Sequence, residues 1–218
     1  MSDLRLPAKS IFSPQRGEVV VGHFSGGRDV TWRLWEDGEA YCGIVVGDGA
    51  DGAALLRHLA EASARTIAVR LIDPRGVLDG IDGVDVWTAE GAAAIALALD
   101  ATRTVMGQTA RAIAHRHPSE MLIPDTAAHQ VLLVDRPDLL APAAQEQVNM
   151  IARLSRKTGV TVVAHCRPSV GTSCEHMLRA LADAHDNVMY LRKSPDSGLL
   201  GYLTADMVPF TPNFGPQN

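Results

Sequence analysis

Gly47 and Gly52 have the five-residue separation of a phosphate-binding loop. In the pattern G-x-x-x-x-G-K-[ST], backbone N–H groups surround the phosphates, the lysine reaches the β and γ phosphates, and the hydroxyl holds Mg²⁺. In this chain alanine occupies both the lysine position and the hydroxyl position, and two carboxylates lie within the loop. The stretch reads Gly47, Asp48, Gly49, Ala50, Asp51, Gly52, Ala53, Ala54. It keeps the spacing of a phosphate site without the groups that hold phosphate.

Three further groups of polar residues follow apolar runs of strand length. They are Asp73 and Arg75 after 66–72, Asp135 and Arg136 after 131–134, and His165, Cys166 and Arg167 after the run that begins at 160. Arg136 lies at the end of a strand that we expect to lie beside the loop at Gly47.

Short apolar runs alternate with amphipathic segments along the chain. We expect strands at 18–23, 30–35, 41–46, 66–72, 84–87, 131–134, 160–164 and 188–191, helices at 50–64, 89–115, 142–158 and 173–184, a loop at 118–129 and an edge hairpin at 201–209. The first two strands are joined by a glycine-rich turn, which predicts a short N-terminal β-hairpin. The rest predicts an α/β fold with a mostly parallel central sheet covered on both faces.

One domain accounts for the 218 residues. We expect an N-terminal arm over 1–17, a single α/β domain over 18–210 and a C-terminal tail over 211–218. No apolar run reaches the roughly 18 to 20 residues of a membrane span, and the N-terminus lacks a signal-peptide core, so we expect a cytoplasmic protein.

The net charge of −5 bears on partners. Proteins that bind nucleic acid by neutralising phosphates usually carry a basic face, so the charge does not support DNA binding, although a local basic edge at Arg153, Arg156 and Lys157 stays open. The three cysteines lack C-x-x-C spacing, and we expect reduced, buried thiols and no metal site.

Four segments of the chain resemble the FtsK/SpoIIIE/TraB family of DNA-translocating ATPases, which includes the type VII secretion ATPases. They are the loop at 47–54, the segment Arg70-Leu71-Ile72-Asp73-Pro74-Arg75-Gly76 against I-D-P-K-G, Val131-Leu132-Leu133-Val134-Asp135-Arg136 against an apolar strand ending in D-E, and Ala164-His165-Cys166-Arg167-Pro168-Ser169-Val170 against A-T-Q-R-P-S-V. Their order and intervals match over about 28–203. The resemblance implies a RecA-like P-loop NTPase fold in three layers, with degenerate Walker A and Walker B motifs.

The departures from the family pattern fall on its chemistry. Asp135 could still bind Mg²⁺ through water, but Arg136 replaces the glutamate that positions the attacking water in the family. His165 and Cys166 replace the Thr-Gln pair that is expected to sense the γ phosphate. Phosphoryl transfer without these groups and the loop lysine lacks charge stabilisation and nucleophile positioning together. We therefore expect no catalytic residue and no cofactor, with ATP and Mg²⁺ only under an alternative interpretation.

That alternative is an ATP-dependent DNA translocase in which Arg57, Arg75 or Arg136 stands in for the lysine. The plainer interpretation makes Arg136 a salt-bridge partner of Asp48, Asp51 or Asp73, which would neutralise an empty pocket. Asp48 and Asp51 have a plain role of their own, because carboxylates near a helix start favour the helix dipole and can accept its free N–H groups.

Trp32 and Trp35 have opposite parity on the strand predicted at 30–35, so we expect one of them to be exposed for partner contact.

The leading functional hypothesis is a catalytically degenerate FtsK/SpoIIIE-like protein that acts as a binding, assembly or regulatory subunit of a DNA-transfer, secretion or phage-like system. We expect a homo-oligomer or a partner ATPase. Type VII secretion ATPases are similar in carrying degenerate modules, some of which bind substrate peptides in the vacated pocket. A third hypothesis is a structural protein that forms a ring or filament.

Overall fold

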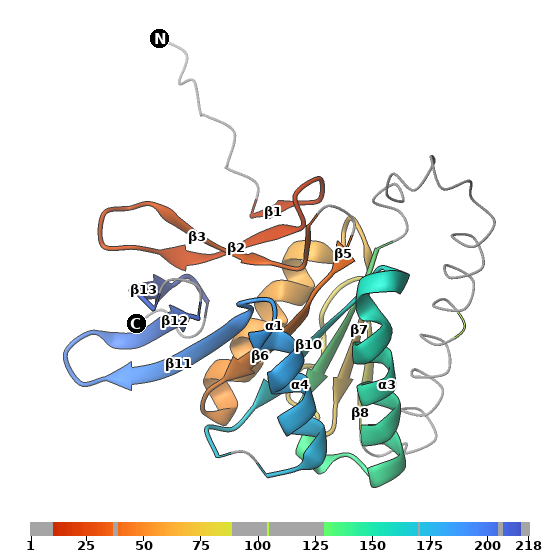
Figure 1. Cartoon of the computed structure of the whole chain (residues 1–218). Helices are drawn as coiled ribbons and strands as arrows, with labels where there is room; N and C mark the ends of the chain where they lie inside the picture. The colour runs from red at the N-terminus through yellow and green to blue at the C-terminus, as the bar shows by residue number, and fades with distance from the viewer. Residues whose placement is uncertain are drawn as a thin grey trace.

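The computed structural model describes residues 11–36, 39–88, 104, 129–169, 171–204 and 207–214. Within these residues, eleven strands form one sheet in the order β1-β2-β13-β12-β11-β6-β10-β9-β7-β8, with β3 paired to β2 (Figure 1). The helix at 89–115 and the loop at 118–129 lie outside the described residues, apart from Thr104 and His129.

The parallel half of the sheet is the part that places the predicted site. Its strands are β6 (Cys42–Val46), β7 (Ala68–Asp73), β8 (Val84–Thr88), β9 (Gln130–Asp135), β10 (Val160–Cys166) and β11 (Val188–Ser194). Every pairing among them is parallel. The predicted parallel sheet is confirmed.

Helices cover both faces of this half. Helix α1 (Gly49–Ser63) packs on one face, and α3 (Pro142–Thr158) and α4 (Ser173–Asp183) pack on the other, in front of the sheet in Figure 1. Alternate residues of a strand point to opposite faces, so Leu71 joins the core under α1 while Ile72 joins the core under α3 and α4. The sheet is buried on both sides, as parallel sheets require.

The antiparallel half joins the N-terminal and C-terminal parts of the chain. It contains β1 (Phe12–Ser13), β2 (Glu18–His23), β3 (Asp29–Arg33), β12 (Gly198–Leu203) and β13 (Pro209–Pro212). The β2–β3 hairpin is confirmed. The pair β12–β13 is no edge hairpin, because β13 also pairs with β2. Strand β1 lies in the segment predicted as an arm, and β13 ends two residues past 210.

The prediction that Trp32 or Trp35 is exposed is wrong, since both are buried. The strand breaks at Leu34: β3 ends at Arg33, and Trp35 begins β4 (Trp35–Glu36), which pairs with β5 (Glu39–Ala40) in a separate two-stranded sheet. Trp35 stacks on His129 with ring centroids 4.4 Å apart. The parity argument fails because the two residues do not share a strand.

The described residues contain no helix that is long and apolar enough to span a membrane. A short 3₁₀ helix, η3 (Pro137–Leu139), begins directly after Arg136.

Candidate functional site

Helix α1 begins so early that no phosphate loop precedes it. Strand β6 ends at Val46, only Gly47 and Asp48 intervene, and α1 starts at Gly49. The Gly52 N–H donates to the Asp48 carbonyl oxygen at 3.0 Å, which is a bond of the first helical turn. A phosphate-binding loop directs such N–H groups at its ligand. Here the residues from Gly49 to Gly52 are already helix, and only Asp48 between the two glycines is extended.

The two carboxylates of this segment differ in role. Asp48 is the N-cap residue of α1, but its side chain accepts no capping hydrogen bond, contrary to the role predicted for it. Asp51 lies in the first turn, where the helix dipole favours negative charge. Its Oδ2 lies 3.6 Å from the Nζ of Lys193 on β11, a residue that sequence reasoning did not single out.

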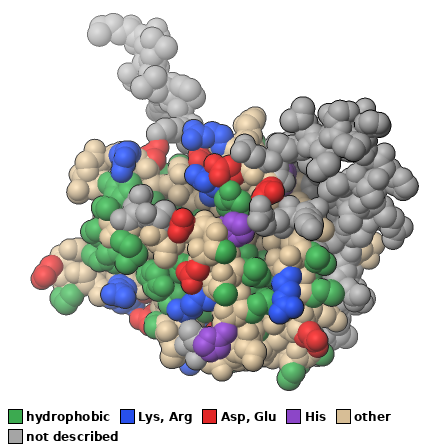
Figure 2. All heavy atoms as spheres, in the orientation of Figure 1, with side chains coloured by type: hydrophobic (Ala, Val, Ile, Leu, Met, Phe, Trp, Pro, Cys, Tyr) green, Lys and Arg blue, Asp and Glu red, His purple; other side chains and the backbone are tan. Residues whose placement is uncertain are grey.

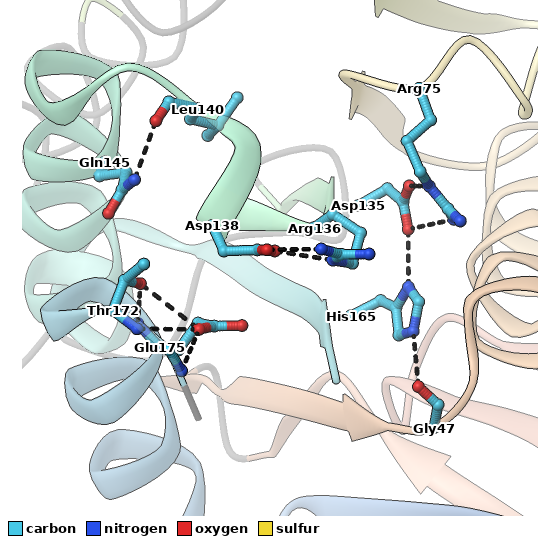
Figure 3. Close-up of polar contacts among 11 residues, drawn as sticks. Gly47, Arg75, Asp135, Arg136, Asp138, Leu140, Gln145, His165, Thr172 and Glu175 are labelled. Carbon is cyan, nitrogen blue, oxygen red and sulfur yellow. Dashed lines mark hydrogen bonds and ion pairs between the residues drawn. The ribbon is translucent and has the colours of Figure 1, made fainter. Parts of the chain in front are cut away.

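Asp135 and His165 meet at the carboxyl ends of β9 and β10, where neither side chain is exposed to solvent (Figure 3). The Nδ1 of His165 lies 2.6 Å from Oδ1 of Asp135, and its Nε2 lies 3.2 Å from the Gly47 carbonyl oxygen. Both oxygens are acceptors once Asp135 is ionised, so the two bonds form together when both ring nitrogens carry protons. The imidazole then bridges Asp135 to the residue that opens the predicted loop.

Arg75 completes this network from the turn after β7. Its Nε donates to Oδ2 of Asp135 at 2.6 Å and its Nη2 to Oδ1 at 3.0 Å. The same Nη2 donates to the Gly49 carbonyl oxygen at 3.0 Å. The bidentate geometry is the strong form of an arginine–carboxylate pair. Arg75, Asp135 and His165 thus connect the turn after β7 and the carboxyl ends of β9 and β10 to the start of α1.

Asp73 acts indirectly by shaping the turn that carries Arg75. Its Oδ1 accepts from the Arg75 backbone N–H at 3.1 Å, and its Oδ2 accepts from the Leu78 N–H at 2.6 Å. A carboxylate that bonds backbone groups a few residues on is the usual device for fixing such a turn. Asp73 therefore positions Arg75 and does not contact the loop.

The imidazole of His165 fills the space beside Gly52. A Cβ built on Gly52 would lie 2.1 Å from Cδ2 and 2.2 Å from Nε2 of this ring. A Cβ built on Gly49 would lie 2.7 Å from Nη1 of Arg75. The imidazole of His165 and the guanidinium of Arg75 thus both lie against the start of α1.

Arg136 does not pair with Asp48, Asp51 or Asp73, so that prediction is wrong. Its backbone is left-handed, with φ 52°, and its side chain turns to Asp138 in η3, with Nε 2.7 Å from Oδ1. The hydrogen bonds from Arg136 lower the pKa of Asp138, and Asp138 in turn raises the pKa of Arg136. The arginine that reaches the loop is Arg75.

The three residues of the fourth segment go to different places. His165 enters the network just described, whereas Cys166 is buried in the core under α3 and α4, where burial raises the pKa of its thiol. Arg167 is exposed. Of this segment, only His165 contributes a side chain to the site. The described residues include no group of three or more His, Cys, Asp or Glu side chains placed to hold a metal ion.

A groove of about 620 Å³ lies beside α1 and shares Gly49 and Arg75 with this network. Ala50, Ala53 and Ala54 line it, as do Arg57 and Glu61, whose charged groups lie 3.9 Å apart. Val77 on one side is 47% exposed. Ala53 and Ala54, at the positions where a phosphate loop would carry lysine and a hydroxyl, thus line a groove with both apolar and charged residues.

Comparison with protein-family models and with curated proteins finds no match for the sequence. Solved structures do match. The cytoplasmic domain of the type VII secretion ATPase EccC from Thermomonospora curvata has a TM-score of 0.67 at 21% identity, over 97% of this chain and 30% of that chain. A structure of EccC ATPases 2 and 3 in complex with a signal sequence peptide has a TM-score of 0.62 at 13% identity, over 97% and 43%.

The pCW3 conjugation coupling protein TcpA, solved as a monomer with ATPγS, matches with a TM-score of 0.56 at 14% identity, over 94% of this chain and 68% of that one. The chain spans less than half the length of the EccC structures. At these identities the likeness shows the fold. This chain has the α/β fold of the ATPase domains of secretion and conjugation proteins.

Proposed function

We propose that this chain is a catalytically degenerate FtsK/SpoIIIE-like protein that binds no nucleotide and acts as a binding, assembly or regulatory subunit of a secretion or DNA-transfer system. The observation that carries the proposal is the network of Arg75, Asp135 and His165 against an α1 that begins at Gly49. Side chains of the protein itself lie against the segment that has the spacing of a phosphate-binding loop.

The chemistry of the site supports this proposal. In-line phosphoryl transfer depends on charge stabilisation by a lysine and a metal, and on a residue that orients the nucleophile. Ala53 and Ala54 supply neither a charge nor a hydroxyl. The guanidinium of Arg75 is shared between Asp135 and the Gly49 carbonyl, so its charge is already neutralised inside the protein.

A role in binding has its own support. The groove beside α1, next to the network, is lined by both apolar residues and charged residues. An EccC structure of the same fold was solved with a signal sequence peptide bound. We therefore propose that the chain contributes a surface to a larger secretion or conjugation assembly in the cytoplasm, together with other copies or with an active ATPase.

Isothermal titration calorimetry with ATP and Mg²⁺ tests the proposal on the wild-type chain and on the single variants Arg75→Ala and Arg136→Ala. We expect no saturable binding in any of the three at millimolar nucleotide. Arg136→Ala is the matched control, because Arg136 pairs with Asp138 away from the loop. Submillimolar binding by the wild-type chain would overturn the proposal.

The position of Arg75 favours one second candidate, an ATP-dependent translocase in which this arginine replaces the loop lysine. Nη2 of Arg75 already contacts Gly49 at the start of α1. The same titration separates the two functions. Wild-type binding that Arg75→Ala abolishes and Arg136→Ala preserves would establish the second candidate.

A further inference from the structure

Strand β3 has a free edge. It pairs with β2, and no other strand of the described residues pairs with it. The Leu34 N–H donates to the Gly17 carbonyl oxygen on the β2 side, and in an antiparallel pair the backbone groups of successive residues point to opposite sides. The N–H and C=O groups of Thr31 and Arg33 therefore point away from β2. An edge of this kind can pair with an added strand.

A pocket of about 210 Å³ borders this edge. It is lined from β3 by Thr31, Trp32 and Arg33, and from the turn between α4 and β11 by His185, Asp186 and Asn187. The Asn187 Nδ2 donates to the carbonyl oxygens of Arg33 at 3.1 Å and Cys42 at 3.2 Å, which holds the turn beside the edge. The Thr31 N–H and C=O and the Arg33 N–H remain for an added strand.

The indole of Trp32 brings a further donor to this pocket. Trp32 is 1% exposed, and its Nε1 is buried without a hydrogen-bond partner in the described structure. A Cβ built on Gly43 would lie 2.9 Å from Cζ2 and 3.4 Å from Cε2 of this ring, and 3.0 Å from the Asn187 Nδ2. Since Nε1 is bonded to Cε2, this edge of the ring lies next to Asn187, which lines the pocket. A buried donor without an acceptor is costly, and a carbonyl oxygen in the pocket would supply one.

The turn beside the pocket is acidic. The last turn of α4 has no basic residue, and Asp183 and Asp186 are exposed at this end, where the helix dipole is negative. Neither carboxylate forms an ion pair with a described residue, and the guanidinium of Arg33 is already paired with Glu36 at 2.6 Å. Figure 2 shows the face that carries α4, with acidic side chains among hydrophobic and basic ones. Both the carboxylates and the dipole favour a cation here.

We propose that an extended segment of a partner protein adds to the outer edge of β3 and places a lysine or arginine side chain in the pocket, near Asp186. Its main chain pairs with Thr31 and Arg33, and one of its carbonyl oxygens accepts from the Trp32 Nε1. Main-chain bonds to a sheet edge supply affinity, and a side-chain pocket supplies specificity. The pocket is smaller than the roughly 300 Å³ at which small-molecule pockets begin, so it suits one side chain.

Isothermal titration calorimetry of the full chain with the peptide acetyl-TVKVT-amide tests this site. We expect saturable binding, and none with acetyl-TVEVT-amide, because the glutamate would face Asp186. Asp186→Asn should weaken binding by about fivefold, the usual range for a partly exposed ion pair. Asp82→Asn is the matched control, since it removes an exposed carboxylate that does not line the pocket, and it should leave the affinity unchanged.

Thr31→Pro tests the edge itself. Proline removes the N–H that points away from β2 and leaves the bonds to β2 in place, so we expect the variant to fold, by circular dichroism, and to bind no peptide. Thr31→Ala keeps the N–H and should bind like the wild-type chain. Wild-type affinity in Thr31→Pro, or no binding of acetyl-TVKVT-amide by the full chain at millimolar concentration, would overturn the proposal.

Amide hydrogen exchange of the full chain, followed by NMR, shows whether the edge is free before a partner arrives. We expect the Thr31 amide to exchange without protection in the free chain and to slow when the peptide is added. Slow exchange in the free chain would mean that another part of this chain, or a second copy, already covers the edge, and would also overturn the proposal. Nucleotide takes no part in these measurements, so their failure is distinct from failure of the proposed function.

Discussion

Gly52 has no room for a side chain, because a Cβ at this position would lie 2.1 Å from Cδ2 of His165. We expect Gly52→Ala to destabilise the fold by about 1 to 3 kcal/mol, the usual cost of forcing a methyl group into a packed site. Chemical denaturation followed by tryptophan fluorescence measures the change. Gly26→Ala is the control, since a Cβ at Gly26 meets nothing within 4 Å.

A double-mutant cycle identifies the ring as the cause. In a His165→Ala background the space beside Gly52 is open, so the additional cost of Gly52→Ala should fall well below its cost in the wild-type chain. Equal costs in the two backgrounds would contradict the proposed contact between Gly52 and His165.

Asp138 gives the protein an acid-sensitive pair. The hydrogen bonds from Arg136 lower the pKa of Asp138 in the folded state below the ordinary value for an aspartate, about 3.9. Between the unfolded and the folded pKa the unfolded chain binds a proton that the folded protein does not. The free energy of unfolding therefore decreases as the pH decreases. The contribution is complete above about pH 5 and is lost as the pH falls through the lowered pKa.

We expect Asp138→Asn to reduce the loss of unfolding free energy between neutral and strongly acidic pH. Urea denaturation at a series of pH values measures this slope. Asp82→Asn, in an exposed turn, controls for the removal of one carboxyl group. An unchanged slope in Asp138→Asn would show that the pair contributes nothing to acid sensitivity.

The convergence of Asp135 and His165 could be predicted, because each follows a buried strand and parallel strands end at one edge. The direction of the two arginines could not. Arg136 follows Asp135 directly, but its left-handed backbone turns its side chain into η3. Arg75 reaches Asp135 through a turn that Asp73 closes, and this depends on tertiary hydrogen bonds that no local pattern encodes.

Helix α4 begins with a complete capping box. The Thr172 hydroxyl accepts from the Glu175 N–H at 3.2 Å, and the Glu175 carboxylate accepts from the Thr172 N–H at 3.1 Å. We expect Thr172→Ala to cost about 1 kcal/mol of stability, because one N–H of the first turn loses its partner. Thr172→Ser keeps the hydroxyl and should retain most of it. Equal losses in the two variants, measured by thermal unfolding, would contradict a capping role.

Most elements could be predicted from periodicity, and α3 has the predicted bounds 142–158. The phosphate-loop interpretation conflicted with the element prediction beside it. A helix predicted from residue 50 already contains Ala50 and Asp51, two of the four residues between Gly47 and Gly52, and α1 begins one residue earlier, at Gly49. Glycine spacing alone cannot distinguish a loop from a helix whose first turn contains glycine. The lysine and the hydroxyl that follow the second glycine make the pattern specific, and this chain lacks both.

The sheet as a whole was harder to predict than its elements. Strand β13 pairs with both β12 and β2, so residues near the two ends of the chain lie side by side (Figure 1). Strand patterns do not specify such distant partners. Phe210 is nevertheless fitted to this junction, since a Cβ on Gly22 or Gly201 would collide with its ring. The antiparallel and parallel halves therefore share one continuous core through β12 and β13.

The three thiols report on the stability of the core under α3 and α4. Cys42, Cys166 and Cys174 come from β6, β10 and α4, and all are buried in the same cluster. Burial raises the pKa of Cys42 and of Cys174 to about 12. Thiol reagents attack the thiolate, so we expect no reaction of the native protein at about pH 8 within minutes.

In concentrated guanidinium chloride all three thiols should react with Ellman's reagent. At intermediate concentrations the three should react at one common rate that rises in parallel with global unfolding, because the layers that bury them separate only when the sheet opens. Variants with single Cys→Ser changes assign each thiol. One thiol that reacts faster than the others, at a rate independent of denaturant, would show that its element opens locally, before the rest of the core under α3 and α4.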